Sequence, residues 1–266
     1  MKDYYAILGL KSDCGTADVR KAYRAKAKEV HPDLVGDEGT ARFLALKEAY
    51  EVLSTPSTRE SYDLTRRTAF RTEATVEWDY RDFLHGRKND PESLARLICY
   101  DLLHDRDSEA VDLYEEAQVG GFFSLRRYLE REDFMDYAFL LAEAYLERDA
   151  VVKAYRLFRG IAELEEEHPY FKHFYAEVLE RMASIVRRSL PDDDDDRLRM
   201  AFLVDLVKLS YPAREEARLR KLLAELLTAA GRHEAAAAEI FKAYALAPKL
   251  PGLAETVKTL RELGMG

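Results

Sequence analysis

The residues with the clearest chemical signal are His31, Pro32 and Asp33, which stand together where a predicted helix must end. Pro32 disfavours helical geometry at His31 and has no N–H group to donate, so the helix stops at this point. The imidazole and the carboxylate are therefore displayed at a helix end. Taken alone, the pair favours an ordinary capping histidine and an ordinary loop acid over a functional role. The surrounding pattern of residues, described below, reverses that preference.

A row of basic side chains precedes this tripeptide. The row, called the basic face below, consists of Arg20, Lys21, Arg24 and Lys28. At helical spacing it lies away from an apolar stripe made of Val19, Tyr23, Ala27 and Val30. A charged helix face is usually a solvated one, but a cationic face also speeds the encounter with an anionic partner and fixes its orientation. Lys26 lies at the edge of the basic face, and we expect it to be solvated.

The other chemically suggestive residues favour no catalytic or metal site. Asp192–Asp196 follow Pro191 without the glycine and spacing of a calcium loop, which favours a solvated loop between helices. The histidines His85, His104, His168, His173 and His233 are scattered over separate predicted helices. The sequence contains no nucleophile elbow, phosphate loop, HExxH or GxGxxG pattern. We therefore expect no enzymatic activity, no metal and no cofactor.

Composition and residue patterns argue against a nucleic-acid-binding, a membrane-spanning or a secreted protein. The net charge of −9 argues against general nucleic-acid binding, which depends on neutralising phosphates. No apolar run is long enough to cross a membrane. The cysteines Cys14 and Cys99 have neither CxxC nor metal-ligand spacing, and the first residues do not resemble a secretory signal. We expect reduced thiols and a cytoplasmic location.

The first 67 residues are predicted to form four helices, at about residues 4–8, 16–30, 40–53 and 57–64. Thr16 is the expected N-cap of the second helix, because its hydroxyl can accept from a free backbone N–H group. The third helix has its own apolar stripe, made of Phe43, Leu46, Tyr50 and Leu53. Two helices with such stripes are expected to pack against each other as an antiparallel hairpin.

Residues 68–90 are interpreted as a short, partly ordered connector. Its aromatic cluster, Trp78, Tyr80 and Phe83, is expected to fasten the connector onto the helices that follow, although a client-binding patch is an alternative.

Residues 91–266 are predicted to be helical throughout, with turns spaced as in helix–turn–helix repeats. Residues 138–169 and 220–248 fit a tetratricopeptide pattern, and residues 94–117 fit it more weakly. Segment 170–211 has the size of a further helix pair but not the signature. The apolar positions of the pattern, such as Leu141, Tyr145, Ala154 and Phe158, are expected to be core residues. The predicted fold is all-α: a helical hairpin with two short helices, followed by a curved tetratricopeptide-like solenoid of about ten helices.

Five landmarks of the first quarter resemble the J domain of the DnaJ family. They are Asp3-Tyr4-Tyr5-Ala6-Ile7-Leu8-Gly9-Leu10, Val19-Arg20-Lys21-Ala22-Tyr23-Arg24, His31-Pro32-Asp33, Lys47-Glu48-Ala49-Tyr50-Glu51-Val52-Leu53-Ser54, and Arg59 with Tyr62-Asp63. The residues Leu34-Val35 depart from the family, in which a basic residue and an asparagine often follow the tripeptide. No Gly/Phe-rich stretch and no CxxCxGxG repeat follows, so the chain resembles the third class of J proteins.

The resemblance implies a specific partner and a specific set of contacts. It implies that the basic face docks on an acidic surface of a DnaK-type chaperone. Tyr23, His31, Pro32 and Asp33 would complete the contact, with Asp33 engaging an arginine of that chaperone and biasing it towards ATP hydrolysis. Such a protein makes and breaks no covalent bonds itself. It acts through contacts that are more favourable in one conformational state of the partner than in the other.

The sequence therefore predicts a co-chaperone with a J domain over residues 1–67, a connector over 68–90 and a helical repeat domain over 91–266. The repeat domain is expected to bind a client or partner protein. The alternative hypothesis is a helical-repeat scaffold or adaptor whose J domain only tethers a chaperone.

Overall fold

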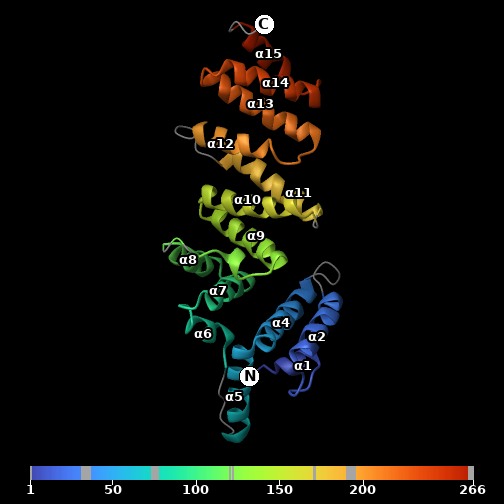
Figure 1. Cartoon of the computed structure of the whole chain (residues 1–266), viewed down its shortest axis with the longest axis vertical. Helices are drawn as coiled ribbons and strands as arrows, with labels where there is room; N and C mark the ends of the chain where they lie inside the picture. The colour runs from blue at the N-terminus through green and yellow to red at the C-terminus, as the bar shows by residue number, and fades with distance from the viewer. Residues whose placement is uncertain are drawn as a thin grey trace. The chain divides into compact units, whose positions relative to one another are not determined.

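The computed structural model describes residues 2–30, 37–72, 78–119, 121, 123–169, 172–189 and 196–262. Every element assigned within these ranges is helical, which confirms the prediction of an all-α protein. The chain divides into two compact units, Met1–Arg106 (unit 1) and Asp107–Gly266 (unit 2), whose helices are labelled in Figure 1.

Unit 1 is built around a pair of helices. Its elements are α1 (Tyr4–Leu8), α2 (Thr16–Glu29), α4 (Asp37–Ser54), α5 (Pro56–Thr72), α6 (Tyr80–His85) and α7 (Pro91–Leu103). Helices α1 and α2 both pack against α4, and Figure 1 shows α2 and α4 side by side. The predicted stripes meet in this core, where Val19, Leu46, Ala49 and Leu53 are buried. The predicted hairpin is thus present, and α5 continues well beyond the predicted end near residue 64.

The N-terminus of α2 is capped one residue earlier than predicted. Gly15, not Thr16, is the N-cap residue, and its backbone N–H group donates to the Asp18 carboxylate (N···Oδ2 2.9 Å). A carboxylate in the first turn satisfies a free donor and complements the helix dipole.

Unit 2 is a succession of helices in which chain neighbours pack on one another. Its elements are α8 (Asp107–Gln118), η1 (Leu125–Arg127), α9 (Arg131–Glu147), α10 (Val151–Glu167), α11 (Lys172–Ser184), the π-helical turn η2 (Ile185–Ser189), α12 (Asp196–Leu206), α13 (Ala213–Ala229), α14 (His233–Leu246) and α15 (Leu253–Glu262). Each of α9, α10 and α13 packs against the α-helix that follows it in the chain, and these stacked pairs can be followed in Figure 1.

The two segments with the best repeat signature form the two most extensive helix pairs, α9 with α10 and α13 with α14. Short turns join each pair, and the turns contain Asp149 (φ 55°) and Gly231 (φ 72°) in the left-handed region. The apolar positions Leu141, Tyr145, Ala154 and Phe158 are buried, which confirms their prediction as core residues.

Within the described residues, no helix has the length and apolar character needed to cross a membrane. The same part of the chain contains no group of three or more histidine, cysteine or acidic side chains arranged to hold a metal ion. The predicted solvated loop at Asp192–Asp196 lies outside the described residues, except for Asp196 at the start of α12.

Candidate functional site

The basic face of α2 points away from the core of unit 1. Its members Arg20, Lys21, Arg24 and Lys28 are all exposed, whereas Val19 of the same helix is completely buried. Among the side chains that the structure describes, these four cations form no ion pair. Since Arg20 and Arg24, and Arg24 and Lys28, are four residues apart, their like charges destabilise the isolated helix slightly, by ~0.2–0.5 kcal/mol a pair. Because no described side chain pairs with these four cations, α2 carries positive charge that a negatively charged partner would neutralise.

Tyr23 lies between the basic face and the core. Its ring stacks on that of Tyr50 of α4, with the centroids 4.3 Å apart and the planes 19° apart, and the residue is half-buried. The stacked pair joins α2 to α4 and so holds the basic face in a constant orientation on the hairpin.

Lys26 is not the solvated side chain that its place in the sequence predicted. Its ammonium group donates to the carbonyl oxygen of Ile7 at the end of α1 (Nζ···O 2.7 Å), in a partly buried position. Gly9 permits this approach, because a Cβ atom there would lie 3.1 Å from Nζ. Lys26 thus satisfies a helix C-terminus within unit 1, and the exposed cations that α2 offers to a partner are those of the basic face.

Tyr5, Arg59 and Asp63 tie α1 to α5 and to the start of α2. The hydroxyl of Tyr5 donates to the Asp63 carboxylate (2.9 Å) and accepts from Nε of Arg59 (3.0 Å). Arg59 also donates to the carbonyl oxygen of Cys14 just before α2 (2.7 Å). Burial and the bond to Asp63 raise the pKa of Tyr5 to about 12, so the phenol stays protonated and keeps donating at physiological pH. Residues from two of the five sequence landmarks therefore have a structural role in placing α2.

Tyr4, Glu48 and Tyr62 form a second, deeper network. The Tyr4 hydroxyl donates to the Glu48 carboxylate (2.6 Å), to which the Lys2 ammonium group also donates (2.7 Å). The Tyr62 hydroxyl donates to the backbone carbonyl of Lys2 (3.0 Å). Burial raises the pKa of Tyr4 well above its ordinary value, and Glu48 raises it further. The buried carboxylate is thus paired rather than isolated, as a buried charge must be.

A family model for the DnaJ domain matches residues 3–63, the segment that holds this hairpin and these networks. Residues 3–63 form a J domain. Three similar proteins carry DnaJ names: Chaperone protein DnaJ of Hydrogenobacter thermophilus (38% identical over 95 residues, 35% of this chain and 25% of that protein), Chaperone protein DnaJ of Cyanothece sp. (48% over 63 residues, 23% and 17%), and Chaperone protein DnaJ 2 of Mycolicibacterium paratuberculosis (46% over 68 residues, 25% and 17%). The chain thus spans a quarter or less of the length of these relatives.

The tripeptide His31-Pro32-Asp33 of the J domain lies outside the described residues. It is part of the segment that joins α2 to α4, and the last described residue before it is Val30, whose N–H group closes the final turn on the Lys26 carbonyl (3.2 Å). The structure therefore describes the basic face and Tyr23, and the roles of His31, Pro32 and Asp33 remain predictions from the sequence.

The aromatic residue Trp78 packs on the J domain as well as on Tyr80 and Phe83 of α6, whose ring centroids lie 6.0 and 5.8 Å from that of Trp78. The contact with the J domain is one that the sequence did not predict. Its indole meets the rings of Tyr4 and Tyr62 edge-on, at centroid distances of 6.1 and 5.7 Å. Its Nε1–H group donates to Oγ of Ser61 (3.4 Å). Tyr80, by contrast, packs edge-on against Tyr100 of α7, as its predicted role requires (5.7 Å).

Helix α7 makes its own contact with the J domain, through a residue that sequence reasoning missed. Arg96 donates to Oγ1 of Thr55 between α4 and α5 (2.9 Å). Within the same unit, Arg81 of α6 forms a two-bond ion pair with the fully buried Asp101 of α7 (2.6 and 3.0 Å). No sequence pattern points to these pairs. The only local signal is Asp90-Pro91, where the Asp90 carboxylate caps α7 by accepting from Ser93, bonds that lower its pKa.

Proposed function

We propose that this protein is a co-chaperone that binds a DnaK-type chaperone through its J domain and stimulates ATP hydrolysis by that chaperone. The basic face supplies the docking surface, together with Tyr23, and His31, Pro32 and Asp33 act at the end of the hairpin. In this proposal unit 2 binds a client or partner protein and so brings it to the chaperone.

The observation that carries the proposal is the exposure of the whole basic face on a J-domain hairpin. Arg20, Lys21, Arg24 and Lys28 are exposed, while the neighbouring Lys26 is used inside the unit. Charge of one sign gathered on a rigid helix face favours rapid, oriented encounter with an acidic surface. The printed names of the similar proteins, all DnaJ chaperones, support the same function.

The role of unit 2 rests on its helix pairs. Tetratricopeptide-like helices that pack on their chain neighbours form extended surfaces on which other proteins bind. The pairs α9–α10 and α13–α14 supply two such modules. We propose that they belong to a tetratricopeptide-like solenoid.

The first prediction concerns chaperone stimulation, measured as single-turnover ATP hydrolysis by a DnaK-type chaperone. We expect His31→Gln to abolish stimulation, and Arg20→Glu with Arg24→Glu to weaken the apparent affinity by about ten-fold or more, equivalent to about 1.4 kcal/mol. Because the docking is electrostatic, stimulation by the unaltered protein should fall as the salt concentration rises.

The matched control is Lys11→Glu with Arg67→Glu, which changes the net charge equally at exposed positions of unit 1 outside α2. It should stimulate like the unaltered protein, and circular dichroism should show full helicity in every variant. Equal stimulation by His31→Gln and by the unaltered protein would contradict the proposal. A stoichiometric complex of unit 2 with another protein, unaffected by any of these changes and without chaperone stimulation, would favour the scaffold alternative.

A further inference from the structure

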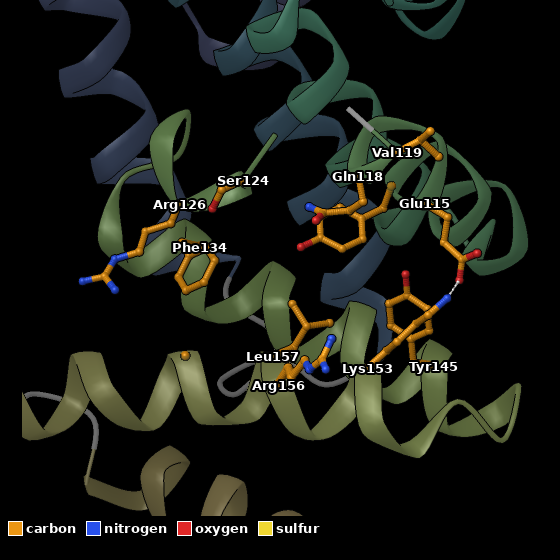
Figure 2. A pocket seen from close by; sticks show the side chains of 12 residues that line it. Glu115, Gln118, Val119, Ser124, Arg126, Phe134, Tyr145, Lys153, Arg156 and Leu157 are labelled. Atoms are coloured by element: carbon orange, nitrogen blue, oxygen red, sulfur yellow. Dashed lines mark hydrogen bonds and ion pairs between the residues drawn. The ribbon is translucent and has the colours of Figure 1, made fainter. Parts of the chain in front are cut away.

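Unit 2 contains a groove of about 600 Å³ between α8, η1, α9 and α10 (Figure 2). One face of α10 forms one side of it, because Lys153, Arg156, Leu157 and Gly160 recur at intervals of three and four residues over two helical turns. In Figure 2, Arg156 and Leu157 rise from α10 into the space below Gln118. The groove is of the size that proteins use to bind small ligands and single anchoring segments.

The wall opposite α10 is held in place by aromatic packing. The ring of Tyr114 meets those of Tyr145 and Phe123 edge-on, at centroid distances of 6.5 and 6.2 Å. The side-chain amide of Gln118 donates to the backbone carbonyl of Phe123 (2.7 Å), which ties the segment after α8 to that helix. Burial raises the pKa of Tyr114 and Tyr145, so both phenols are neutral at physiological pH. This wall is preformed and offers aromatic surface without negative charge.

The groove has more positive charge than its own acidic side chain neutralises. Glu115 pairs with Lys153, as the dashed line in Figure 2 shows. Arg156 is exposed and forms no ion pair with the side chains that the structure describes. Among the same described side chains, Arg126 has one ion pair, a long contact with Glu167 (3.6 Å) in which both side chains are about half exposed, and such pairs are weak. Two guanidinium groups therefore remain able to bind an anion.

This positive charge stands out against its surroundings. Residues 107–266 contain 23 lysines and arginines against 31 aspartates and glutamates, so unit 2 as a whole is negative. A nucleic acid would be repelled by that excess and would find only two uncompensated cations in the groove. An acidic segment of a protein can use two separate arginines, because each guanidinium group can bind one carboxylate with two parallel hydrogen bonds.

Gly160 keeps the groove open at the end near Phe134. Glycine inside a helix costs about 1 kcal/mol relative to alanine. The backbone does not require a glycine at position 160, because the φ angle of Gly160 is not positive. Crowding does not require one either, because a Cβ atom there would lie 3.9 Å from Cζ of Phe134, an ordinary contact distance. The missing side chain leaves room beside Phe134 for an apolar group that is not part of this chain.

We propose that this groove binds an acidic peptide segment of a client or partner protein. In Figure 2, Arg126 and Arg156 lie on opposite sides of Phe134. One carboxylate of the peptide pairs with Arg156, a second pairs with Arg126, and an apolar side chain between the two carboxylates lies against Phe134 and Leu157. The assignment rests on the proposed function of unit 2 as the part that binds protein, and it specifies where and with what chemistry that binding occurs.

The test is fluorescence anisotropy of full-length protein with the labelled peptide Gly-Asp-Phe-Asp-Leu-Asp-Gly, blocked as an amide at its C-terminus. Two matched peptides carry Lys or Asn in place of every Asp. We expect the Asp peptide to bind, the Asn peptide to bind at least ten-fold more weakly and the Lys peptide not to bind. The affinity for the Asp peptide should fall as salt is added, because exposed ion pairs are screened.

The decisive variant is Arg126→Glu with Arg156→Glu, which should lower the affinity for the Asp peptide at least ten-fold. Its control, Arg214→Glu with Arg232→Glu, makes the same change of charge at exposed positions of unit 2 outside the groove and should bind within two-fold of the unaltered protein. Gly160→Leu places a side chain in the groove and should also abolish binding. Circular dichroism shows whether each variant is folded.

Equal binding by the groove variant and its control would overturn the assignment, and so would equal binding of the Lys and Asp peptides or tighter binding of a single-stranded oligonucleotide. No binding of the Asp peptide by the unaltered protein overturns it as well, even if chaperone stimulation is intact. Loss of stimulation with peptide binding intact overturns the co-chaperone proposal alone, so the two failures are distinguishable.

Discussion

At the scale of single residues, aromatic side chains hold the J domain to the helices behind it. Trp78 covers the rings of Tyr4 and Tyr62, and Tyr80 is almost completely buried beside Tyr100. Aromatic pairs of this kind contribute ~0.5–1.5 kcal/mol beyond the area they bury. The indole is also the only one in the chain, so no second tryptophan replaces it.

We therefore predict that Trp78→Ala lowers the free energy of unfolding of unit 1 by about 2 kcal/mol. This is less than the ~3–5 kcal/mol typical of a fully buried tryptophan, because Trp78 is only half-buried. Urea unfolding followed by circular dichroism measures the change. Trp78→Phe is the control, since it keeps the ring packing and loses only the bond to Ser61, and it should cost less than half as much. An alanine variant as stable as the unaltered protein would contradict the packing described for Trp78.

At the scale of elements, helical periodicity predicted correctly which faces are buried and which are exposed. Val19 on the apolar stripe of α2 is buried, and the basic face lies in solvent. Periodicity failed for Lys26 because the partner of its ammonium group, the Ile7 carbonyl, belongs to another helix. The sequence also misplaced one helix end. Gly15 and Asp18 cap α2, where the sequence favoured Thr16.

Two glycines of unit 2, Gly160 within α10 and Gly231 in the turn between α13 and α14, give opposite predictions for the same substitution. Gly160→Ala should raise the free energy of unfolding by about 1 kcal/mol, because α10 is helical there and the added methyl group fits beside Phe134. Gly231→Ala should lower it by about 1 kcal/mol, because its φ of 72° is unfavourable for any residue with a Cβ atom. Thermal unfolding of the two variants side by side measures both. A lower melting temperature for Gly160→Ala would show that the space beside Phe134 is not available.

At the scale of the whole molecule, the first compact unit extends to Arg106 and includes α6 and α7. The J-domain match ends at residue 63. The ion pair of Arg81 with Asp101 makes α6 and α7 one body, and Trp78 and Arg96 attach that body to the J domain.

A fragment of residues 1–106 is accordingly predicted to be more stable than a fragment of residues 1–72, by about 2 kcal/mol or more. The physical reason is that the shorter fragment exposes the apolar surface of Tyr4 and Tyr62 that Trp78 covers, and burying one large side chain stabilises a protein by ~1.5–3 kcal/mol. Urea unfolding of both fragments measures the difference. Both should carry a folded hairpin, and equal midpoints would mean that α6 and α7 add nothing to the stability of the J domain.

The sequence by itself determined the J domain, the exposed basic face and the helix pairs of unit 2, because each depends on residues close together in the chain. Helical spacing fixes which side chains share a face, and Pro32 fixes where a helix stops, whatever the rest of the molecule does. Only the tertiary structure decided that Lys26 turns inward to α1, that Trp78 and Arg96 return to the J domain, and that Arg126 and Arg156 line one groove. Each of these brings together residues from separate helices, and such contacts depend on how the helices pack, which no local pattern encodes.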